Sequence, residues 1–224
     1  MGHPKILPCG DSAVAVEFGS VIDPLINREV YALFNKLKAE PPLGLIDLIP
    51  TYRSLLVQYD PTVLSFKDLQ KIVFSFSELS GGAAETVGRL VEIPVCYGNA
   101  YGPDLKVVAD YLHLTEEEII EIHSKAVYQV YMIGFTPGFP YLGGLDPRLF
   151  APRKKVPREL VPAGTVGIAD QQTGIYPIDS PGGWQLIGRT PIKLFDLDRE
   201  EVFYLKPGDR VKFNPISEEE FEHH

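Results

Sequence analysis

The chain has 224 residues, of which 45% are hydrophobic and 23% charged, as is typical of a soluble globular protein of one or two domains. Its formal net charge of −9 argues against binding to nucleic acid. No apolar run approaches the roughly 20 residues that span a bilayer, and the first residues lack a signal-peptide pattern. We therefore expect a cytoplasmic protein without nucleic-acid or membrane partners, in which Cys9 and Cys96 are buried free thiols.

The first 80 residues alternate between strand and helix patterns. Asp23-Pro24 predicts the start of a helix that ends before Pro41-Pro42, and the capping-box pattern Ser65-x-x-Asp68 predicts a second helix that ends at Gly81-Gly82. Four strands are expected at residues 6–7, 13–18, 45–49 and 54–59. The order ββαββα predicts a ferredoxin-like α+β sandwich over residues 1–85, with two helices on one face of an antiparallel sheet. No residue of this half suggests catalysis.

The small, polar segment 81–86 predicts a domain boundary, and residues 86–224 then form the second domain. A strand is expected at 89–96, helices at 103–112 and 115–125, and a further strand at 127–133. Short apolar runs separated by Gly or Pro follow, with a tight turn at 206–210 before a last strand at 211–213. This pattern predicts a mainly β domain built as a barrel, and we expect the acidic tail 217–224 to be loose.

The segment 134–191 contains 10 of the 20 glycines, 9 of the 20 prolines and the only tryptophan. Glycine permits backbone conformations that other residues avoid, and proline fixes φ. A segment rich in both that also carries aromatic residues predicts shaped loops between short strands, which is typical of a binding or catalytic cleft.

Basic residues are concentrated at one place in this acidic chain. Five basic residues and no acidic residue lie between Arg148 and Arg158. Because a guanidinium group binds carboxylates and phosphates in bidentate geometry, Arg153 and Arg158 are candidates for an anion site, and Arg189 is another. The alternative is a solvated loop neutralised by acids elsewhere, which we favour for Lys154 and Lys155.

Other candidate residues have a structural interpretation as well. His123, near the end of the helix at 115–125, is either a structural hydrogen-bonding residue or a proton-transfer group, and the first role is the more common. Trp184 is either a core residue or a platform for a planar substrate, and Gly182-Gly183 either forms a turn or lets a ligand approach the backbone. The five histidines do not have metal-ligand spacing, so no metal site is expected. The chain also lacks a phosphate-binding P-loop, a GxGxxG motif and a GxSxG motif.

A set of ordered motifs in the second half carries a family resemblance. They are residues 123–133, GFTPGFPYL at 134–142, PR at 152–153 and 157–158, VPAG at 161–164, QTGIYP at 172–177 and PGGWQLIGRTP at 181–191. With them the whole chain resembles the family of allophanate hydrolase subunit 1 and the 5-oxoprolinase B subunit. This family also includes the sporulation-kinase inhibitor KipI and the matching carboxyltransferase subdomain C/D of urea carboxylase. Thr165 and Asp170 depart from the residues usual in the family, which are serine and glycine.

The resemblance implies a cyclophilin-like β-barrel at residues 86–224 and a role as the B subunit of an ATP-dependent 5-oxoprolinase. With separate A and C subunits, such an enzyme opens 5-oxo-L-proline to L-glutamate, and the site would lie between paired barrels. ATP would be a cofactor, held either on this chain or on a partner. Under this hypothesis Arg153, Arg158 and Arg189 hold anionic groups and His123 transfers a proton or orients a partner. The cleft would be lined by four further substrate-binding candidates, which are Gln172, Tyr176, Gly183 and Trp184.

Alternative functions are a KipI-like inhibitor that binds a histidine kinase and a subunit that acts on urea-like amides such as allophanate. A further alternative, compatible with the enzyme, is a chain that is inactive alone and completed only when it joins its partners. Whether the chain also forms a homo-oligomer is open.

Overall fold

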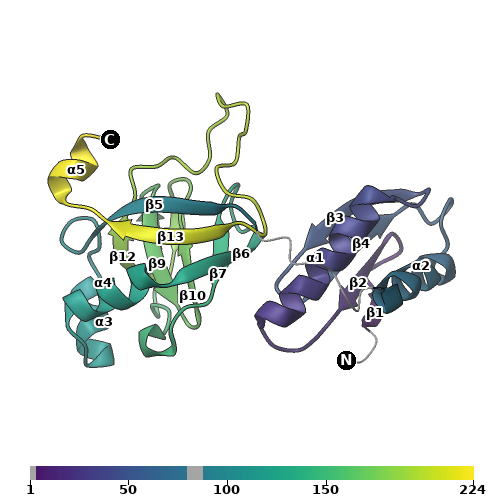
Figure 1. Cartoon of the computed structure of the whole chain (residues 1–224), viewed down its shortest axis with the longest axis horizontal. Coiled ribbons are helices and arrows are strands. Elements are labelled where there is room, and N and C mark those ends of the chain that lie inside the picture. Colours follow the sequence, from purple (N-terminus) through teal and green to yellow (C-terminus); the bar gives the residue numbers. More distant parts are fainter. Residues whose placement is uncertain (1–3, 80–87) are drawn as a thin grey trace. The chain divides into compact units, whose positions relative to one another are not determined.

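The computed structural model describes residues 4–79 and 88–224. The chain folds into two compact units, Met1–Thr86 and Val87–His224 (Figure 1). The predicted boundary segment 81–86, including Gly81-Gly82 at the end of the second helix, lies outside the described residues. Among the described residues, no helix is long and apolar enough to cross a membrane. Each unit has its own hydrophobic core.

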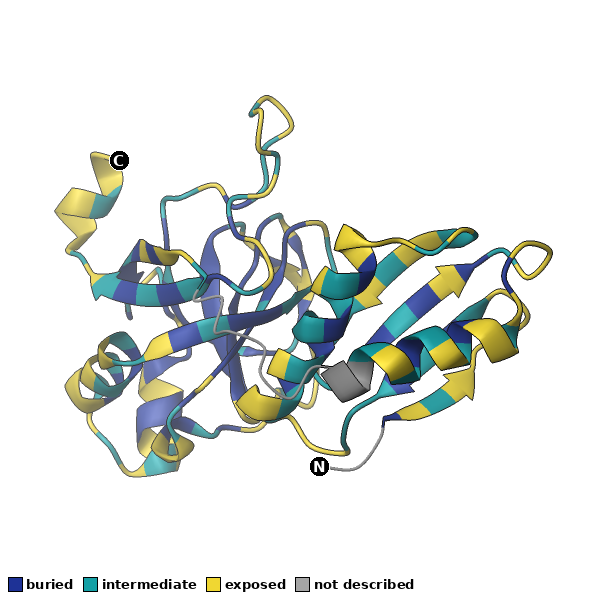
Figure 2. Ribbon diagram, turned by 45° about the vertical axis from the view of Figure 1, so that its right-hand side comes forward, coloured by how far each residue is buried: buried dark blue, intermediate teal, exposed yellow. Residues whose placement is uncertain are grey.

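The first unit is a four-stranded antiparallel sheet with two helices. Its elements are β1 (Lys5–Pro8), β2 (Ala13–Glu17), α1 (Pro24–Ala39), β3 (Leu45–Pro50), β4 (Ser54–Tyr59) and α2 (Phe66–Leu79), and the sheet order is β1-β2-β4-β3. The predicted start of α1 is confirmed, since the Asp23 carboxylate accepts hydrogen bonds from the backbone N–H groups of Leu25 and Ile26. Alternate residues of β2 and β4 pack against the helices, whose inner sides are buried and outer sides exposed (Figure 2).

The second unit is a closed barrel with attached helices. Its elements are β5 (Leu90–Tyr97), α3 (Leu105–Leu112), α4 (Glu116–Lys125), β6 (Val127–Ile133), β7 (Pro140–Gly143), a 3-10 turn η1 (Pro147–Leu149), β8 (Arg158–Val161), β9 (Thr165–Ala169), β10 (Gln172–Ile175), β11 (Ser180–Gly182), β12 (Gln185–Arg189), β13 (Arg210–Pro215) and α5 (Glu218–Glu222). Seven strands close the barrel in the order β10-β7-β6-β13-β5-β12-β9, and β8 and β11 form a separate two-stranded ribbon. The prediction of a barrel is confirmed.

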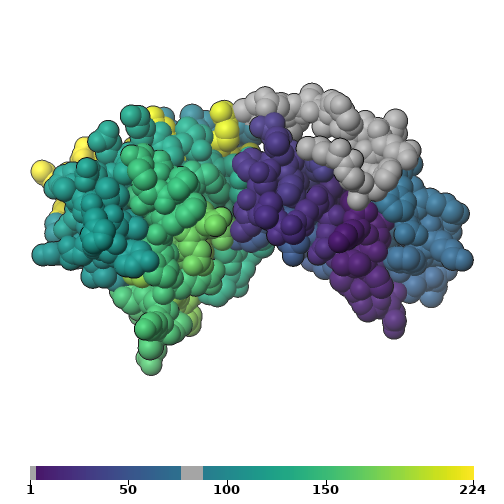
Figure 3. All heavy atoms as spheres, turned by 90° about the horizontal axis from the view of Figure 1, so that it is seen from below, coloured from purple at the N-terminus to yellow at the C-terminus, as the bar shows by residue number. Residues whose placement is uncertain are grey.

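Helices α3 and α4 pack together on the barrel, and Figure 3 shows their atoms (teal) beside the green atoms of the same unit. The capping box at Thr115 and Glu118 fixes the start of α4 as predicted: each side chain bonds to the backbone N–H of the other residue. The helix predicted at 103–112 begins at Leu105, because Pro103 and Asp104 form the turn that precedes it.

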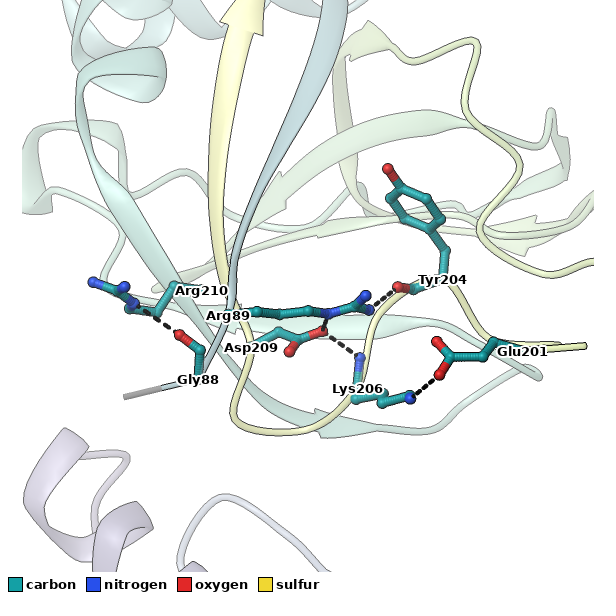
Figure 4. Close-up of polar contacts among 7 residues, drawn as sticks. All are labelled: Gly88, Arg89, Glu201, Tyr204, Lys206, Asp209 and Arg210. Carbon is teal, nitrogen blue, oxygen red and sulfur yellow. Dashed lines mark hydrogen bonds and ion pairs between the residues drawn. The ribbon is translucent and has the colours of Figure 1, made fainter. Parts of the chain in front are cut away.

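A buried carboxylate holds the two parallel strands β5 and β13 together where β5 begins. Nε of Arg89 donates to Oδ2 of Asp209 at 2.9 Å, and the backbone N–H of Lys206 donates to the same oxygen at 2.8 Å (Figure 4). Asp209 is 6% exposed and belongs to the predicted turn 206–210, which the structure confirms. A side chain at Gly88 would collide with the carbonyl of Gly208, so the two chain segments can pass this closely only with glycine at position 88.

Two expectations from the sequence are wrong. Cys96 is buried as expected, but Cys9 is exposed because it lies just beyond the edge strand β1; both are free thiols. The tail is not loose throughout, because residues 218–222 form α5. Ser217 and Glu220 close a capping box at its start, and the ring of Phe221 packs on Tyr101.

Candidate functional site

All seven barrel strands contribute to the main core of the second unit, and a separate small apolar cluster packs on the opposite, outer face of the barrel wall. Its members, here called the outer cluster, are Phe139, Val161, Ala169, Tyr176, Trp184 and Leu186, with Tyr141 packed against them. The wall is thin here because Gly174 of β10 has no side chain: a Cβ at this position would lie 3.0 Å from both the Phe139 ring and the Trp184 ring. Trp184, which is 5% exposed, therefore rests directly on the barrel backbone.

The Pro-rich segment 152–158, which carries four of the five clustered basic residues, is attached to this cluster at several points. The backbone N–H of Lys154 donates to the carbonyl of Gly183 at 2.7 Å, and Nε2 of Gln185 donates to the carbonyl of Pro152 at 2.8 Å. The guanidinium of Arg153 lies 5.8 Å from the centre of the Trp184 ring, and its Nε donates to Oδ2 of Asp170 at 3.1 Å. The loop is thus held over the residues that follow β11.

A buried carboxylate beneath the loop binds two of the loop's basic side chains. Oδ1 of Asp104 accepts from Nη2 of Arg158 at 2.7 Å and from Nζ of Lys154 at 3.1 Å, while Oδ2 accepts from the backbone N–H of Leu186 at 2.8 Å. Asp104 is only 3% exposed. Burial raises the pKa of this carboxyl group, but the hydrogen bonds from Arg158, Leu186 and Lys154 outweigh burial and hold the pKa below its usual value. Asp104 is therefore ionised at neutral pH.

The charges of this arrangement do not cancel. Two cations, Arg158 and Lys154, share the single anion Asp104, which leaves one net positive charge beside the outer cluster. Nη1 of Arg158 is buried and has no hydrogen-bond partner among the described residues. A buried guanidinium N–H without a partner is costly, so this donor would be stabilised by an acceptor from outside the described residues.

Eight residues are candidates for the site on sequence grounds, and the structure brings four of them together: Arg153, Arg158, Gly183 and Trp184 meet at the loop 152–158. Tyr176 is fully buried directly beneath, where its hydroxyl accepts from the backbone N–H of Trp184. Gln172 lies two residues from Asp170, the partner of Arg153, in the hairpin that joins β9 and β10. Lys155 is exposed, as expected for a solvated loop, and Lys154 is paired with Asp104, which agrees with the expected neutralisation of the loop by an acid elsewhere in the chain.

His123 lies on the other side of the barrel wall. Its Nε2 is 2.9 Å from Oγ1 of Thr173, which precedes Gly174 in β10, and successive strand residues point to opposite faces. Because Trp184 contacts Gly174 on the outside, His123 is on the inside, where it is fully buried and stacked on Phe213. Burial lowers its pKa to about 3.

The hydrogen bonds of His123 define a neutral ring. The Thr173 hydroxyl donates its one proton to the carbonyl of Gly167 at 3.0 Å, so it must accept a hydrogen bond from Nε2. The Tyr97 hydroxyl, at 2.8 Å, then donates to Nδ1. A neutral imidazole with both nitrogens bonded inside the core fits a structural role for His123.

Arg189 is placed apart from Arg158. Nε of Arg189 donates at 2.9 Å to the carbonyl of Ala163, which follows β8, whereas Arg158 is the first residue of β8 and binds Asp104. The two guanidinium groups therefore have different partners.

No sequence motif indicated Asp104 or Gln185: Asp104 resembles an ordinary helix cap, and its partners are 50 to 82 residues away in the chain.

Comparison with known proteins adds a family and a set of relatives. Residues 4–205 match the family described as carboxyltransferase domain, subdomain C and D. The chain is 45% identical to the 5-oxoprolinase B subunit of Bacillus subtilis, over 97% of this chain and 95% of that protein. The crystal structure of TTHA0988 has a TM-score of 0.81 and 41% identity over 92% of this chain, which spans 40% of that longer chain. The urea amidolyase structure from K. lactis has a TM-score of 0.82 at 23% identity, a likeness in fold that covers 98% of this chain and 15% of that one.

Proposed function

The chain belongs to the family of carboxyltransferase domains, subdomains C and D, and on this premise we propose that it is the B subunit of a 5-oxoprolinase. The observation that carries the proposal is the 45% identity to a 5-oxoprolinase B subunit over almost the full length of both proteins. In this role the chain works with separate A and C subunits on the conversion of 5-oxo-L-proline to L-glutamate, at the expense of ATP. The chain is inactive alone.

The positive charge at the loop 152–158 supports a role in binding the anionic substrate. 5-Oxoproline carries a carboxylate, and opening its lactam by hydrolysis generates a second carboxylate. Preorganised N–H donors that face such groups stabilise the charge that develops in the reaction. We assign the substrate carboxylate to Arg158, whose Nη1 lacks a partner among the described residues, with Arg153 beside it over Trp184.

ATP fits this arrangement poorly. Lys154 and one edge of Arg158 are already bound to Asp104, and Arg153 is bound to Asp170, so the cluster offers a single net positive charge. A triphosphate chain carries several negative charges and is bound in proteins by several donors or by a metal ion. We therefore assign ATP to one of the partners and the small anion to this chain.

The remaining candidate residues receive the following roles. Gly183 lets a ligand approach the backbone, Trp184 and Tyr176 form the apolar floor, and Gln172 belongs to the edge near Asp170. Arg189 holds a second anionic group or the chain segment at Ala163. His123 acts as a structural residue of the barrel core, since both ring nitrogens are already hydrogen-bonded there.

We also propose a fold class for each of the two units. The antiparallel order β1-β2-β4-β3 with its two helices supports a ferredoxin-like arrangement in which the last strand of the usual order comes first in the chain. The closed seven-stranded barrel supports a cyclophilin-like second domain.

The experiment that tests the function is co-purification with candidate A and C subunits, followed by assays with 5-oxoproline and, separately, with urea. We expect a stable three-subunit complex that releases glutamate only when ATP and 5-oxoproline are both present. A stable complex that consumes urea and leaves 5-oxoproline unchanged would assign the chain to the urea-type branch of the family. A chain that binds neither candidate but inhibits a histidine kinase would be a regulator.

A further inference from the structure

Asp104 occupies a position from which an aspartate normally caps a helix, but its carboxylate is used differently. It is the N-cap residue of α3, and capping side chains usually accept from the first backbone N–H groups of the helix. Here the two carboxylate oxygens accept from Arg158 and Lys154 of the loop 152–158 and from Leu186 of β12. The backbone N–H of Asp104 also donates to the carbonyl of Leu186 at 2.9 Å, so the residue is fixed to β12 from both sides.

This carboxylate sets the orientation of the Arg158 guanidinium. The group is planar and rigid, so fixing Nη2 at 2.7 Å from Oδ1 of Asp104 also fixes the direction in which Nη1 points. The Arg158 side chain is 27% exposed, but Nη1 itself is buried, so an anion reaches this donor only when the atoms that cover it move aside. Arg158 would otherwise be a long side chain with several rotamers, and ordering it during substrate binding would weaken binding.

We propose that Asp104 is the positioning residue of the anion site, because it holds Arg158 in the orientation that receives the substrate carboxylate. Asp104 acts through Arg158 and needs no contact with the substrate. The inference rests on the proposed function, since it assumes that Arg158 binds the anionic substrate. It assigns a role to a residue that neither the sequence motifs nor the basic cluster identified.

Positioning and plain electrostatics predict opposite effects for the same substitution. Asp104→Asn removes a negative charge next to Arg158 and Lys154 and so makes the site more positive. If only local charge mattered, an anionic substrate would bind more tightly and its KM would fall. If Asp104 orients Arg158, the variant loses the charge-assisted hydrogen bond that fixes the guanidinium, and KM rises.

The chain contains a matched control for the loss of a buried carboxylate. Asp209 is also almost fully buried, also bonds to one arginine, Arg89, and also accepts from one backbone N–H (Figure 4). Its ion pair closes the barrel at the start of β5, so Asp209→Asn reproduces the destabilisation without touching Arg158. A purely structural role of Asp104 would give the two variants the same kinetics.

The experiment compares both variants in the three-subunit complex, with 5-oxoproline as the varied substrate. We expect Asp104→Asn to raise KM about tenfold with kcat within about twofold of wild type, the size of one lost charge-assisted hydrogen bond, and Asp209→Asn to leave KM unchanged. In an Arg158→Ala background, Asp104→Asn is expected to change KM less than about twofold, because a residue that acts through Arg158 has nothing left to orient. A lower KM in Asp104→Asn, or equal effects of the two asparagine variants, would overturn the proposal.

A crystal structure of the Asp104→Asn chain separates this proposal from the proposed function. Positioning predicts that the Arg158 guanidinium moves or becomes disordered while α3 and β12 stay in place. An unmoved guanidinium would refute the positioning role whatever the substrate is. A wild-type complex that is inactive on 5-oxoproline, combined with a displaced Arg158 in the variant, would instead refute only the proposed function.

Discussion

The backbone of Gly182 passes directly over the hydroxyl group of Tyr176. A Cβ at position 182 would lie 2.3 Å from the Tyr176 Oη and 2.7 Å from two ring carbons, inside van der Waals contact. Tyr176 cannot move aside easily, because its ring is 1% exposed and packed edge-to-face against Phe139. The close approach holds the ribbon of β8 and β11, with Arg158 opposite Gly182, onto the outer cluster.

Gly182→Ala is therefore expected to destabilise the second unit by about 1–3 kcal/mol, the usual cost of an overpacked core. Urea denaturation of the purified wild-type and Gly182→Ala chains measures this difference in the free energy of unfolding. Gly183→Ala is the matched control, because a Cβ there would lie 3.7 Å or more from its neighbours and is expected to leave stability unchanged. Equal stabilities of the two alanine variants would show that Tyr176 does not confine Gly182.

Gly183→Ala also tests the proposed approach of a ligand to the backbone. Since the added methyl group has room in the chain itself, any loss of function comes from the ligand side. We expect a several-fold rise in KM for 5-oxoproline in the three-subunit complex, with kcat almost unchanged. A wild-type KM would remove Gly183 from the substrate-binding residues.

Arg158→Lys tests the anion site itself. Lysine retains the charge but cannot bind Asp104 and a substrate carboxylate with two edges of one planar group. A loss of at least about tenfold in kcat/KM is expected, as for a lost charge-assisted hydrogen bond. Lys155→Ala removes an exposed cation of the same loop and is expected to change kcat/KM less than about twofold. Equal effects would mean that the overall charge of the loop, not Arg158, attracts the substrate.

His123 makes the stability of the chain depend on pH in a defined direction. Its pKa is lowered from 6.5 to about 3 by burial, so between these values the unfolded chain binds a proton that the folded chain does not. The folded state therefore loses about 1.4 kcal/mol per pH unit as the pH falls below 6.5, and this residue has no such effect above that value. His123→Gln removes this dependence.

Urea denaturation of the wild-type chain and His123→Gln at about pH 7, 6 and 5 measures the effect across the range in which the two pKa values differ. The stability advantage of the wild type is expected to be present at neutral pH and to shrink on acidification. A constant difference across this range would show that His123 titrates normally in the folded chain. Turnover by the complex containing His123→Gln, once corrected for folded protein, is expected to remain near wild type, and a large loss would support the proton-transfer role.

Local signals in the sequence predict much of the fold. The Asp23-Pro24 start of α1 and the Thr115 capping box depend on residues within one helical turn, and both are confirmed. The same signal at Ser217 and Glu220 indicates α5, but the acidic composition of the tail suggests a loose segment and masks it. These features are readable because their hydrogen bonds connect near neighbours in the chain.

The candidate site could be predicted only in part, because its contacts connect residues that are far apart in the chain. The basic cluster indicates Arg153 and Arg158, but not the carboxylate that organises them, since Asp104 is 54 residues from Arg158 in sequence. His123 and Trp184 belong to one family motif set, yet the barrel wall lies between them. The two residues contact opposite faces of β10, and neither belongs to that strand. Their spacing in the sequence therefore does not show that they lie on opposite sides of it.

The most direct test of the central claim is to omit this chain from the assembled enzyme. Purified A and C subunits are mixed with ATP and 5-oxoproline, glutamate is measured, and this chain is then added in increasing amounts. A role as the B subunit predicts background glutamate release without the chain and a rise that saturates near one copy of the chain per copy of each partner. Full activity of the A and C subunits alone, or no activity at any amount of this chain, would contradict it.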